Sequence, residues 1–309
     1  MSAVAQGPSP APAPAPAAAA PRRSRTHAAW ARAAGFLTPS VALLGALFLG
    51  PMIAMVIVSF QHGPVSGQVG PTFANYTSIF QDSLYADVAL RTLYIATIAM
   101  AVQLLIAFPL AYVMAFRAGR FEIPLLLALV LADELSPMVR IYAWRMLLGR
   151  EGIINSGLMS LGIVDQPVDA LLFSRFAVIV VLSTSWITYT AIPIYAAMKA
   201  VDKRMFEAAK DLGAGWWTTL TRVLLPLVAP GVFIALLLVY IPLFTDFATP
   251  TLVGGPSGYM LGNTVNDLVL GSGDLNGGAA MSMLLLLASA LFSLVAFRLA
   301  RINRLETSS

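Results

Sequence analysis

The chain has 309 residues, of which 58% are hydrophobic and 11% charged, and its net charge is +4. Ordinary soluble domains carry about 25% charged residues, so this chain lacks the charge needed to cover soluble domains. The composition indicates a polytopic membrane protein, and it excludes a disordered chain. It also excludes a nucleic-acid-binding module, because a charge of +4 makes only a weak field. Cysteine is absent, which excludes disulfides, thiol nucleophiles and zinc–thiolate sites.

Residues 1–34 begin with alternating proline and alanine and continue into four arginines. Such a Pro-rich run cannot build a core, so it predicts an extended or disordered cytoplasmic tail. The apolar stretch that follows, residues 35–60, exceeds the usual signal-peptide core of about 7–15 residues and has no convincing cleavage site. We interpret it as a first membrane span that is not removed.

A membrane helix needs about 20 mostly apolar residues. Six segments meet this requirement: 35–60, 88–116, 123–148, 172–198, 224–250 and 277–300. The third and fifth contain carboxylates and prolines, so we expect them to face protein or a water-filled path. The sequence therefore predicts an all-α membrane protein with six transmembrane helices in a domain of residues 35–304, followed by a short tail of residues 305–309.

Lysine and arginine are distributed unevenly between the predicted loops. They occur in the N-terminal tail, in the loops at 117–122 and 199–222, and near the C-terminus, whereas the loops at 61–87 and 251–276 contain none. Because Lys and Arg are retained on the cytoplasmic side, this pattern predicts that both termini are cytoplasmic.

The longest predicted cytoplasmic loop holds a spaced motif: Glu207-Ala208-Ala209, Gly213 and, after nine intervening residues, Val223-Leu224-Leu225-Pro226. Residues 202–212 are good helix formers with Asp202 as a plausible N-cap. Met205, Ala209 and Leu212 form an apolar strip on this helix. The glycine permits a sharp turn into a second short helix. Such an amphipathic helix pair below the bilayer is suited to contact another protein.

The motif resembles the EAA loop of the integral-membrane permease subunits of type I ABC importers. That family's pattern is E-A-A, three residues, G, nine residues, a β-branched residue, one residue and L-P, and this chain fills it without a gap. In the family, the helix sits in a groove of the ATPase subunit and transmits its closure to the membrane helices. The resemblance implies six ATPase-coupling residues: Glu207, Ala208, Ala209, Gly213, Leu225 and Pro226.

Each of these residues has an implied role. Glu207 would make the charged contact with the ATPase, Ala208 and Ala209 would permit close helix approach, and Gly213 would form the turn. The alternative interpretation is a solvated juxtamembrane helix without a partner.

Shorter patterns resemble the spermidine/putrescine permease group: Val139–Trp144 with Gly152 and Asn155, Phe247–Gly255, Gly262-Asn263 and Gly278–Ala280. The implied function is that of a permease subunit for a polyamine (putrescine or spermidine) or a related organic cation, in a bacterial cytoplasmic (inner) membrane. The group also includes permeases for other small solutes, which remain an alternative.

The chain has no G-x-x-x-x-G-K-[ST] phosphate loop, so we expect no ATP site and no enzymatic activity of its own. The resemblance implies that ATP and Mg bind to a dimer of partner ATPase subunits. It also implies a second permease subunit, favoured to be a paralogue, and an extracytoplasmic solute-binding protein. The lipid bilayer is the remaining partner, and no nucleic acid is expected.

Three carboxylates fall inside predicted spans, where each should have a partner or water because burying a charge is costly. One hypothesis is that they line the substrate path and attract an organic cation, with aromatic side chains adding cation–π contacts. The alternative is internal pairing, for example of Asp133 or Glu134 with Arg140, and lipid-interface positions for the aromatic residues. The candidate path residues are Asp133, Glu134, Asp246, Tyr142, Trp144 and Trp186.

Two other classes of protein are alternatives to the importer. An ion-coupled secondary transporter could carry protons on the same carboxylates, but it predicts inverted repeats, of which the sequence shows no clear sign, and it leaves the EAA loop unexplained. A membrane enzyme is disfavoured because His27 and His62 are predicted on opposite sides of the membrane and no Ser/His/Asp set shares one side. We therefore expect no catalytic and no metal-binding residues.

Overall fold

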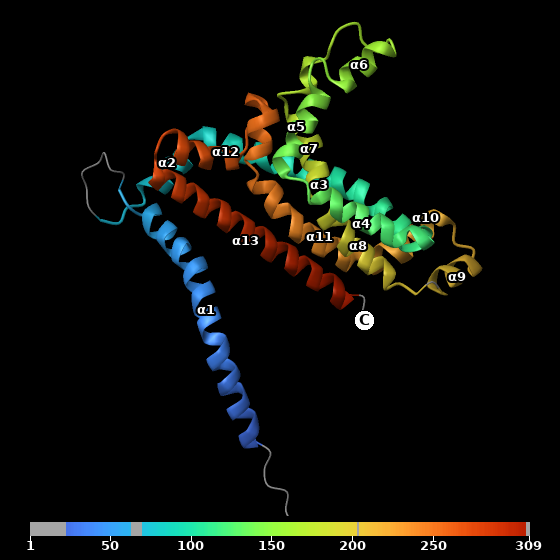
Figure 1. The fold of residues 1–309 in the computed structure, drawn as a ribbon, viewed down its shortest axis with the longest axis horizontal. Coiled ribbons are helices and arrows are strands. Elements are labelled where there is room, and N and C mark those ends of the chain that lie inside the picture. Colours follow the sequence, from blue (N-terminus) through green and yellow to red (C-terminus); the bar gives the residue numbers. More distant parts are fainter. Residues whose placement is uncertain (1–22, 63–69, 203, 307–309) are drawn as a thin grey trace, which may run out of the picture. The chain divides into compact units, whose positions relative to one another are not determined.

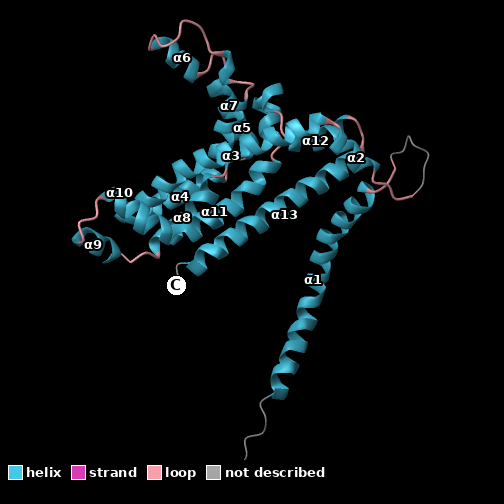
Figure 2. Ribbon diagram, turned by 180° about the vertical axis from the view of Figure 1, so that it is seen from behind, coloured by secondary structure: helices cyan, strands magenta, loops and turns pink. Residues whose placement is uncertain are grey.

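The computed structural model describes residues 23–62, 70–202 and 204–306. These residues form helices joined by short loops (Figures 1 and 2), and no β-strand occurs among them apart from an isolated bridge between Gln61 and Pro71. The chain divides into two compact units, Met1–Ala54 and Met55–Ser309, with the boundary inside the first helix.

The helices of the described chain are α1 (Arg23–Ser59), α2 (Ala74–Gln81), α3 (Ser83–Tyr112), α4 (Glu122–Asp133), α5 (Pro137–Leu148), α6 (Ile153–Ser160), α7 (Arg175–Ser185), α8 (Ile187–Lys199), α9 (Arg204–Asp211), α10 (Trp216–Thr219), α11 (Leu225–Thr245), α12 (Leu261–Asn266) and α13 (Leu275–Glu306). Short π-helical segments extend or join several of them: Val113–Arg117, Leu220–Leu224, Pro250–Gly254 and Asp267–Gly271.

Four helical stretches within the described residues are long and apolar enough to cross a membrane: Thr38–Ser59, Ser83–Arg117, Trp216–Thr245 and Leu275–Arg298. They coincide with the first, second, fifth and sixth predicted spans. The fifth ends at Thr245, earlier than predicted. Helix α1 begins at Arg23, so residues 23–34 of the predicted disordered tail are helical, and the rest of that tail lies outside the described residues.

The third predicted span, residues 123–148, is not one continuous helix. The chain forms α4 and α5, each 12 residues long, which is too short to cross a bilayer alone. Pro137 causes the interruption, because a proline cannot donate a helical hydrogen bond and it pushes the preceding residue out of the helical conformation. Ser136 accordingly has φ −48° and ψ 130°.

The fourth predicted span is also interrupted. Helices α7 and α8 are bent by 47° at Trp186, and together they make a fifth candidate span. Three successive hydroxyl side chains at the end of α7, Ser183, Thr184 and Ser185, donate hydrogen bonds to main-chain oxygens three or four residues earlier. Such bonds weaken and bend a helix, which accounts for the position of the bend.

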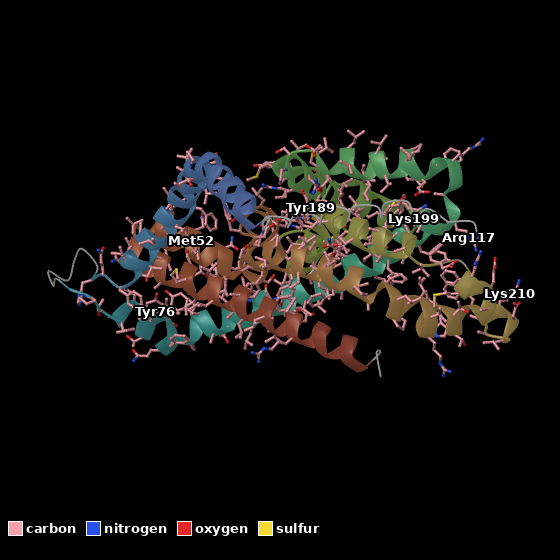
Figure 3. All side chains as sticks on the ribbon, turned by 90° about the horizontal axis from the view of Figure 1, so that it is seen from below. Met52, Tyr76, Arg117, Tyr189, Lys199 and Lys210 are labelled. Carbon is pink, nitrogen blue, oxygen red and sulfur yellow. The ribbon has the colours of Figure 1, made fainter. Side chains whose placement is uncertain are left out.

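Cationic side chains collect at one end of the second unit. Arg117, Lys199 and Lys210 lie at the end where α9 is found, Tyr76 lies toward the opposite end, and Tyr189 lies between them (Figure 3). At the cationic end, Lys199 Nζ forms an ion pair with Glu122 Oε1 at 2.8 Å. This pair holds the start of α4 against the end of α8.

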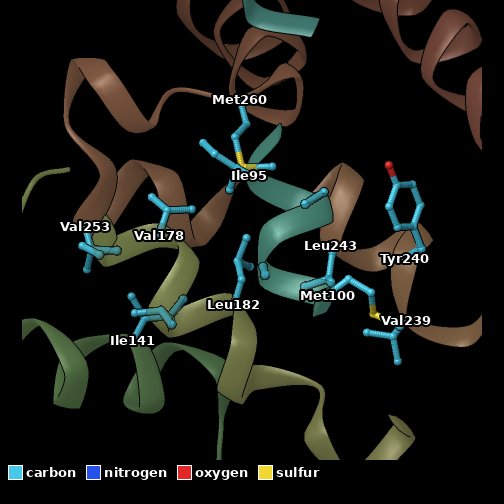
Figure 4. Close-up of a cluster of buried hydrophobic side chains, with 14 of the residues drawn as sticks. Ile95, Met100, Ile141, Val178, Leu182, Val239, Tyr240, Leu243, Val253 and Met260 are labelled. Atoms are coloured by element: carbon cyan, nitrogen blue, oxygen red, sulfur yellow. The ribbon is translucent and has the colours of Figure 1, made fainter. Parts of the chain in front are cut away.

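The interior of the second unit contains several apolar clusters. The largest joins α3, α5, α7 and α11 (Figure 4) and includes Ile95, Met100, Ile141, Val178, Val181, Leu182, Val239, Leu243, Val253 and Met260. A second joins α3 and its π-helical extension to α8 and α11 near α9, and a third joins α2, α3, α12 and α13. Long-range packing among α3, α7, α8 and α11 thus forms the centre of the unit.

Gly231 sets the distance between α8 and α11. A Cβ atom added at this position would lie 2.5 Å from the Ala197 Cβ and 2.7 Å from the Pro193 carbonyl oxygen. Small residues at helix contacts allow backbones to approach closely in membranes. Substitution here must therefore push apart two helices of the central bundle.

We expect Gly231→Ala to destabilise the protein by about 1–3 kcal/mol, the usual cost of overpacking. The measurement is the thermal unfolding of the purified protein in detergent. The matched control is Gly157→Ala in α6, where an added Cβ meets nothing within 4 Å. Equal unfolding temperatures for the two variants would contradict the close contact.

Candidate functional site

Helix α9 carries the Glu-Ala-Ala motif, and its first turn is capped as predicted. The main-chain N–H of Arg204 donates to Asp202 Oδ1 at 2.9 Å. Glu207 and Ala208 are exposed, whereas Ala209 is buried. The charged residue of the motif therefore faces outward while the helix is held from its other side.

The residue that anchors α9 differs from the predicted apolar strip. Met205 is 44% exposed and Leu212 is 89% exposed, so only Ala209 of that strip is buried. The anchor is Phe206, whose ring lies 5.3 Å from that of Phe116 in an edge-to-face arrangement. The sequence could have indicated Phe206 as the anchor, because it lies three residues before Ala209 and residues three apart share a helix face.

Gly213 ends α9 in a Schellman turn. Its φ is +78°, its N–H donates to the Lys210 carbonyl at 2.9 Å, and the N–H of Ala214 donates to the Ala209 carbonyl at 2.9 Å. These two bonds satisfy the last carbonyls of the helix, and the positive φ favours glycine. The turn predicted at Gly213 is therefore present.

From this turn a single helical stretch, Trp216–Thr245, leads into the centre of the unit. Leu225 and Pro226 lie in the first turn of α11, directly after the π-helical segment Leu220–Leu224. The N–H of Leu225 donates to the Leu220 carbonyl. Proline has no N–H to continue the ladder, and such a gap commonly accompanies a local change of helix type. Leu224 is buried, so this junction packs on the same cluster that holds Phe206.

A second group of candidate residues gathers where α4 and α7 are interrupted. Arg140 Nη2 lies 3.3 Å from Asp133 Oδ1 and donates to the Asp133 carbonyl at 3.1 Å, while Nη1 donates to the Ser185 carbonyl at 2.5 Å. The Arg140 and Asp133 side chains are only 16% and 14% exposed. Asp133 is thus an internally paired carboxylate, and Arg140 bridges the C-terminal ends of two helices, where a cation is favourable.

Glu134 lies beside this pair but is placed differently. It is exposed, and none of the hydrogen bonds or ion pairs among the described residues reaches its carboxylate. It lines a cavity of about 280 Å³ together with Val130, Asp133, Thr188, Tyr189, Ile192, Pro193 and Leu238. The cavity has walls from α4, α8 and α11.

Asp246 is not part of this cavity, and it lies just after the end of a helix rather than inside one, although the predicted fifth span continued to residue 250. Helix α11 ends at Thr245, and the Asp246 carboxylate accepts hydrogen bonds from the Thr249 N–H at 2.9 Å and from Thr249 Oγ1 at 3.0 Å. Burial raises the pKa of the Asp246 carboxyl, and the two bonds from Thr249 act in the opposite direction. The side chain starts the next helical turn, as a capping aspartate does.

The three predicted aromatic residues also lie in different surroundings. Trp144 packs against the largest apolar cluster and its Nε1 donates to Thr184 Oγ1 at 3.0 Å, whereas Tyr142 is half exposed and outside the cavity lining. Trp186 also packs on that cluster, and its ring lies 5.6 Å from the ring of Tyr189. Tyr189 lines the cavity although it is not among the six candidate path residues. Its position three residues after Trp186 was the available signal.

Gly262 and Asn263, which belong to the shorter motifs, pack against the backbone around Asp246. A Cβ atom on Gly262 would lie 2.6 Å from the Asp246 carbonyl oxygen. The side-chain amide of Asn263 donates to the Phe247 carbonyl at 3.1 Å and to Thr251 Oγ1 at 2.7 Å. These residues shape the backbone after α11. As for metals, no group of three or more potential ligand side chains occurs in the part of the chain that the structure describes.

The described residues form several long apolar helices, interrupted helices around a polar pair, and a surface helix joined to the bundle by one tight turn. This is the architecture of a multi-pass membrane transport protein. The sequence profile of the binding-protein-dependent transport system inner membrane component matches residues 84–305. The chain belongs to this family, and it is a multi-pass protein of the bacterial inner membrane.

Individual relatives confirm the resemblance stated from the EAA loop. The chain is 34% identical over 227 residues to the spermidine/putrescine transport system permease protein PotB of Haemophilus influenzae, covering 74% of this chain and 79% of that protein. It is 32% identical over 231 residues to PotB of Escherichia coli, covering 75% and 83%. A bacterial alginate ABC transporter, solved in complex with an alginate pentasaccharide-bound periplasmic protein, contains a chain with the same fold at a TM-score of 0.72 and 16% identity, covering 92% and 99%.

We expect Gly213→Ala to loosen the end of α9, because alanine in a left-handed conformation costs about 1–2 kcal/mol. A strain of that size raises the locally opened population about 5–30-fold. The measurement is the rate of tryptic cleavage after Lys210 in the purified protein. Gly215→Ala is the matched control, because Gly215 has φ −69° and open space around it; identical cleavage rates would contradict the turn.

We expect Arg140→Gln to destabilise the protein by about 3 kcal/mol, because it leaves the carboxylate of Asp133 without its partner. Asp133→Asn should cost less, since an amide oxygen still accepts from the guanidinium. The double variant should be more stable than Arg140→Gln alone, as measured by thermal unfolding of all four proteins. Strictly additive losses would show that the two side chains do not interact.

Proposed function

We propose that this chain is the permease subunit of a type I ABC importer and forms part of the translocation path for a polyamine (putrescine or spermidine) or a related organic cation. The observation that carries the proposal is the position of Glu207. It is exposed on a helix that is anchored by Phe206 and joined through Gly213 to the stretch Trp216–Thr245. The similarity to PotB proteins over about three quarters of the chain supports the polyamine class.

We extend the proposal to the membrane topology. The interrupted pair α4–α5 serves as the third of six spans and the bent pair α7–α8 as the fourth, with both termini in the cytoplasm. The gathering of Arg117, Lys199 and Lys210 at the end where α9 lies supports this orientation (Figure 3), because cationic loops stay on the cytoplasmic side.

The partners follow from the same assignment. Two ATPase subunits bind ATP and Mg and receive α9, with Glu207 making the charged contact and the exposed Ala208 permitting close approach. A second permease, a paralogue of this chain, completes the path, and an extracytoplasmic solute-binding protein delivers the substrate. The complex of the alginate transporter with its periplasmic protein supports the last of these by analogy of fold.

The chain itself supplies the mechanical link. Helix α11 carries Leu225 at its start and Leu238 in the cavity wall, 13 residues further on. At a rise of 1.5 Å per residue this is about 20 Å of continuous helix. Closure of the ATPases moves α9, and the rigid stretch transmits the motion to the cavity, so that access alternates between the two sides. No covalent intermediate is formed.

We expect Glu207→Lys to abolish uptake of labelled spermidine and putrescine by cells expressing the complete system, because a cation then faces the ATPase where a carboxylate is needed. Asp211→Lys is the matched control, one turn along the same helix. A lysine in the last turn complements the helix dipole, so α9 stays folded and at least about half of the uptake remains. Membrane insertion of each variant is checked by immunoblotting.

The outcomes separate the parts of the proposal. Undiminished uptake by Glu207→Lys would contradict the coupling role of α9 and favour an ion-coupled transporter. Absence of polyamine uptake by the wild-type system would leave the importer architecture in place and assign the path to another small solute.

A further inference from the structure

We propose that Glu134 and Tyr189 form the subsite in this chain that holds an ammonium group of the substrate during its passage. The inference rests on the proposed function and deepens it, because it selects one carboxylate and one aromatic ring out of the six candidates and their neighbours. The substrate class that fits the subsite is a primary or secondary alkylamine with an extended methylene chain.

Two of the three candidate carboxylates are already held by other residues of this chain. Asp133 is held by Arg140, with 3.3 Å between the charged atoms, and Asp246 is held by Thr249 at the end of α11. The charge of Asp133 is therefore compensated by a cation, and both carboxylate oxygens of Asp246 are occupied by hydrogen bonds within its own turn. Glu134 alone has no such partner among the described residues, and it borders the cavity.

The length of the flanking helices indicates how deep in the membrane Glu134 lies. The ion pair between Glu122 and Lys199 brings the cytoplasmic ends of α4 and α8 to one level. Asp133 lies 11 residues after Glu122 on α4, which is about 17 Å along the helix. Trp186 lies 13 residues before Lys199, about 20 Å along α8. Since the hydrocarbon core is about 30 Å thick, both interruptions lie near its middle.

At this depth, an ionised carboxylate that faced lipid would be strongly unfavourable. Glu134 must therefore face water, a partner subunit or a passing cation. The cavity of about 280 Å³ beside it is much larger than the space of about 30 Å³ that one water molecule occupies. A substrate group can thus enter it.

The lining of the cavity matches an alkylamine. The carboxylate of Glu134 attracts an ammonium group, and the ring of Tyr189, 48% exposed, offers a π face of the kind that binds cations. Val130, Ile192 and Leu238 supply apolar surface suited to methylene groups. Leu238 belongs to α11, so the same helix that leads from α9 forms one wall of the subsite.

The experiment uses the natural absence of cysteine from this chain. Glu134→Cys is placed in the complete importer, and spermidine uptake into sealed vesicles is measured. The measurement is repeated after treatment with each of three methanethiosulfonate reagents: the negatively charged sulfonatoethyl, the positively charged trimethylammonium-ethyl and the uncharged methyl reagent. Ser136→Cys is the matched control, because Ser136 is exposed in the same interruption but does not line the cavity. The untreated wild-type complex reports any effect of the reagents on partner subunits.

We expect Glu134→Cys to lower spermidine uptake by about tenfold or more, the effect of losing a hydrogen bond to a charged group, while basal ATP hydrolysis of the purified complex persists. The sulfonatoethyl reagent should restore at least about a third of the uptake, because it returns a negative charge, and the other two reagents should not. Ser136→Cys should import at the wild-type rate. Tyr189→Phe should retain uptake and Tyr189→Leu should lose it, because only phenylalanine keeps the π face.

Two results would overturn the inference: wild-type uptake by Glu134→Cys, or restoration that does not depend on the charge of the reagent. If Tyr189→Leu and Tyr189→Phe import equally, Tyr189 is not part of the subsite. A wild-type complex that imports no polyamine contradicts the proposed substrate instead. Loss of both uptake and basal ATP hydrolysis in Glu134→Cys would show a structural role for Glu134 and would also overturn the inference.

Discussion

The arrangement of the polar centre depends on the contacts that the Arg140 guanidinium makes with Asp133 and Ser185. A charge in an apolar interior is tolerated when it is paired and hydrogen-bonded, and Arg140 is bonded to the carboxylate and carbonyl of Asp133 and to the carbonyl of Ser185. These bonds hold the ends of α4 and α7 together. They also compensate Asp133 and leave the adjacent Glu134 as the uncompensated charge at the cavity.

A second constraint is the continuity of the helix that leads from the surface to the cavity. Two main-chain hydrogen bonds close the turn at Gly213. The helical stretch Trp216–Thr245, which contains the π-helical segment Leu220–Leu224, then leads past Gly231 to the cavity wall. Its contact with α8 at Gly231 leaves no room for a side chain. Only the short turn at Gly213 separates α9 from this stretch, and in the proposed transport cycle a displacement of α9 would pass along it to the cavity wall.

Local patterns in the sequence were enough to predict the elements that depend on local physics. Asp202 caps α9 and Gly213 ends it, because both interactions are made within a few residues of chain. The interruption at Pro137 could have been predicted from the same rules, yet hydropathy alone merged α4 and α5 into one span. Phe206 was missed as the anchor of α9, because its partner, Phe116, comes from a distant helix.

The sequence by itself determined the class of protein, the long apolar helices and the spaced motif on α9, because composition, hydropathy and turn chemistry are properties of neighbouring residues. Only the tertiary structure decided which of the three carboxylates has a partner within the chain. Asp133 and Glu134 are adjacent and chemically alike, and Asp246 resembled them in its apolar surroundings. Folding brings Arg140 to Asp133 and brings side chains of α8 and α11 to the cavity beside Glu134. Only these contacts from distant helices distinguish the paired carboxylate from the one that has no partner among the described residues.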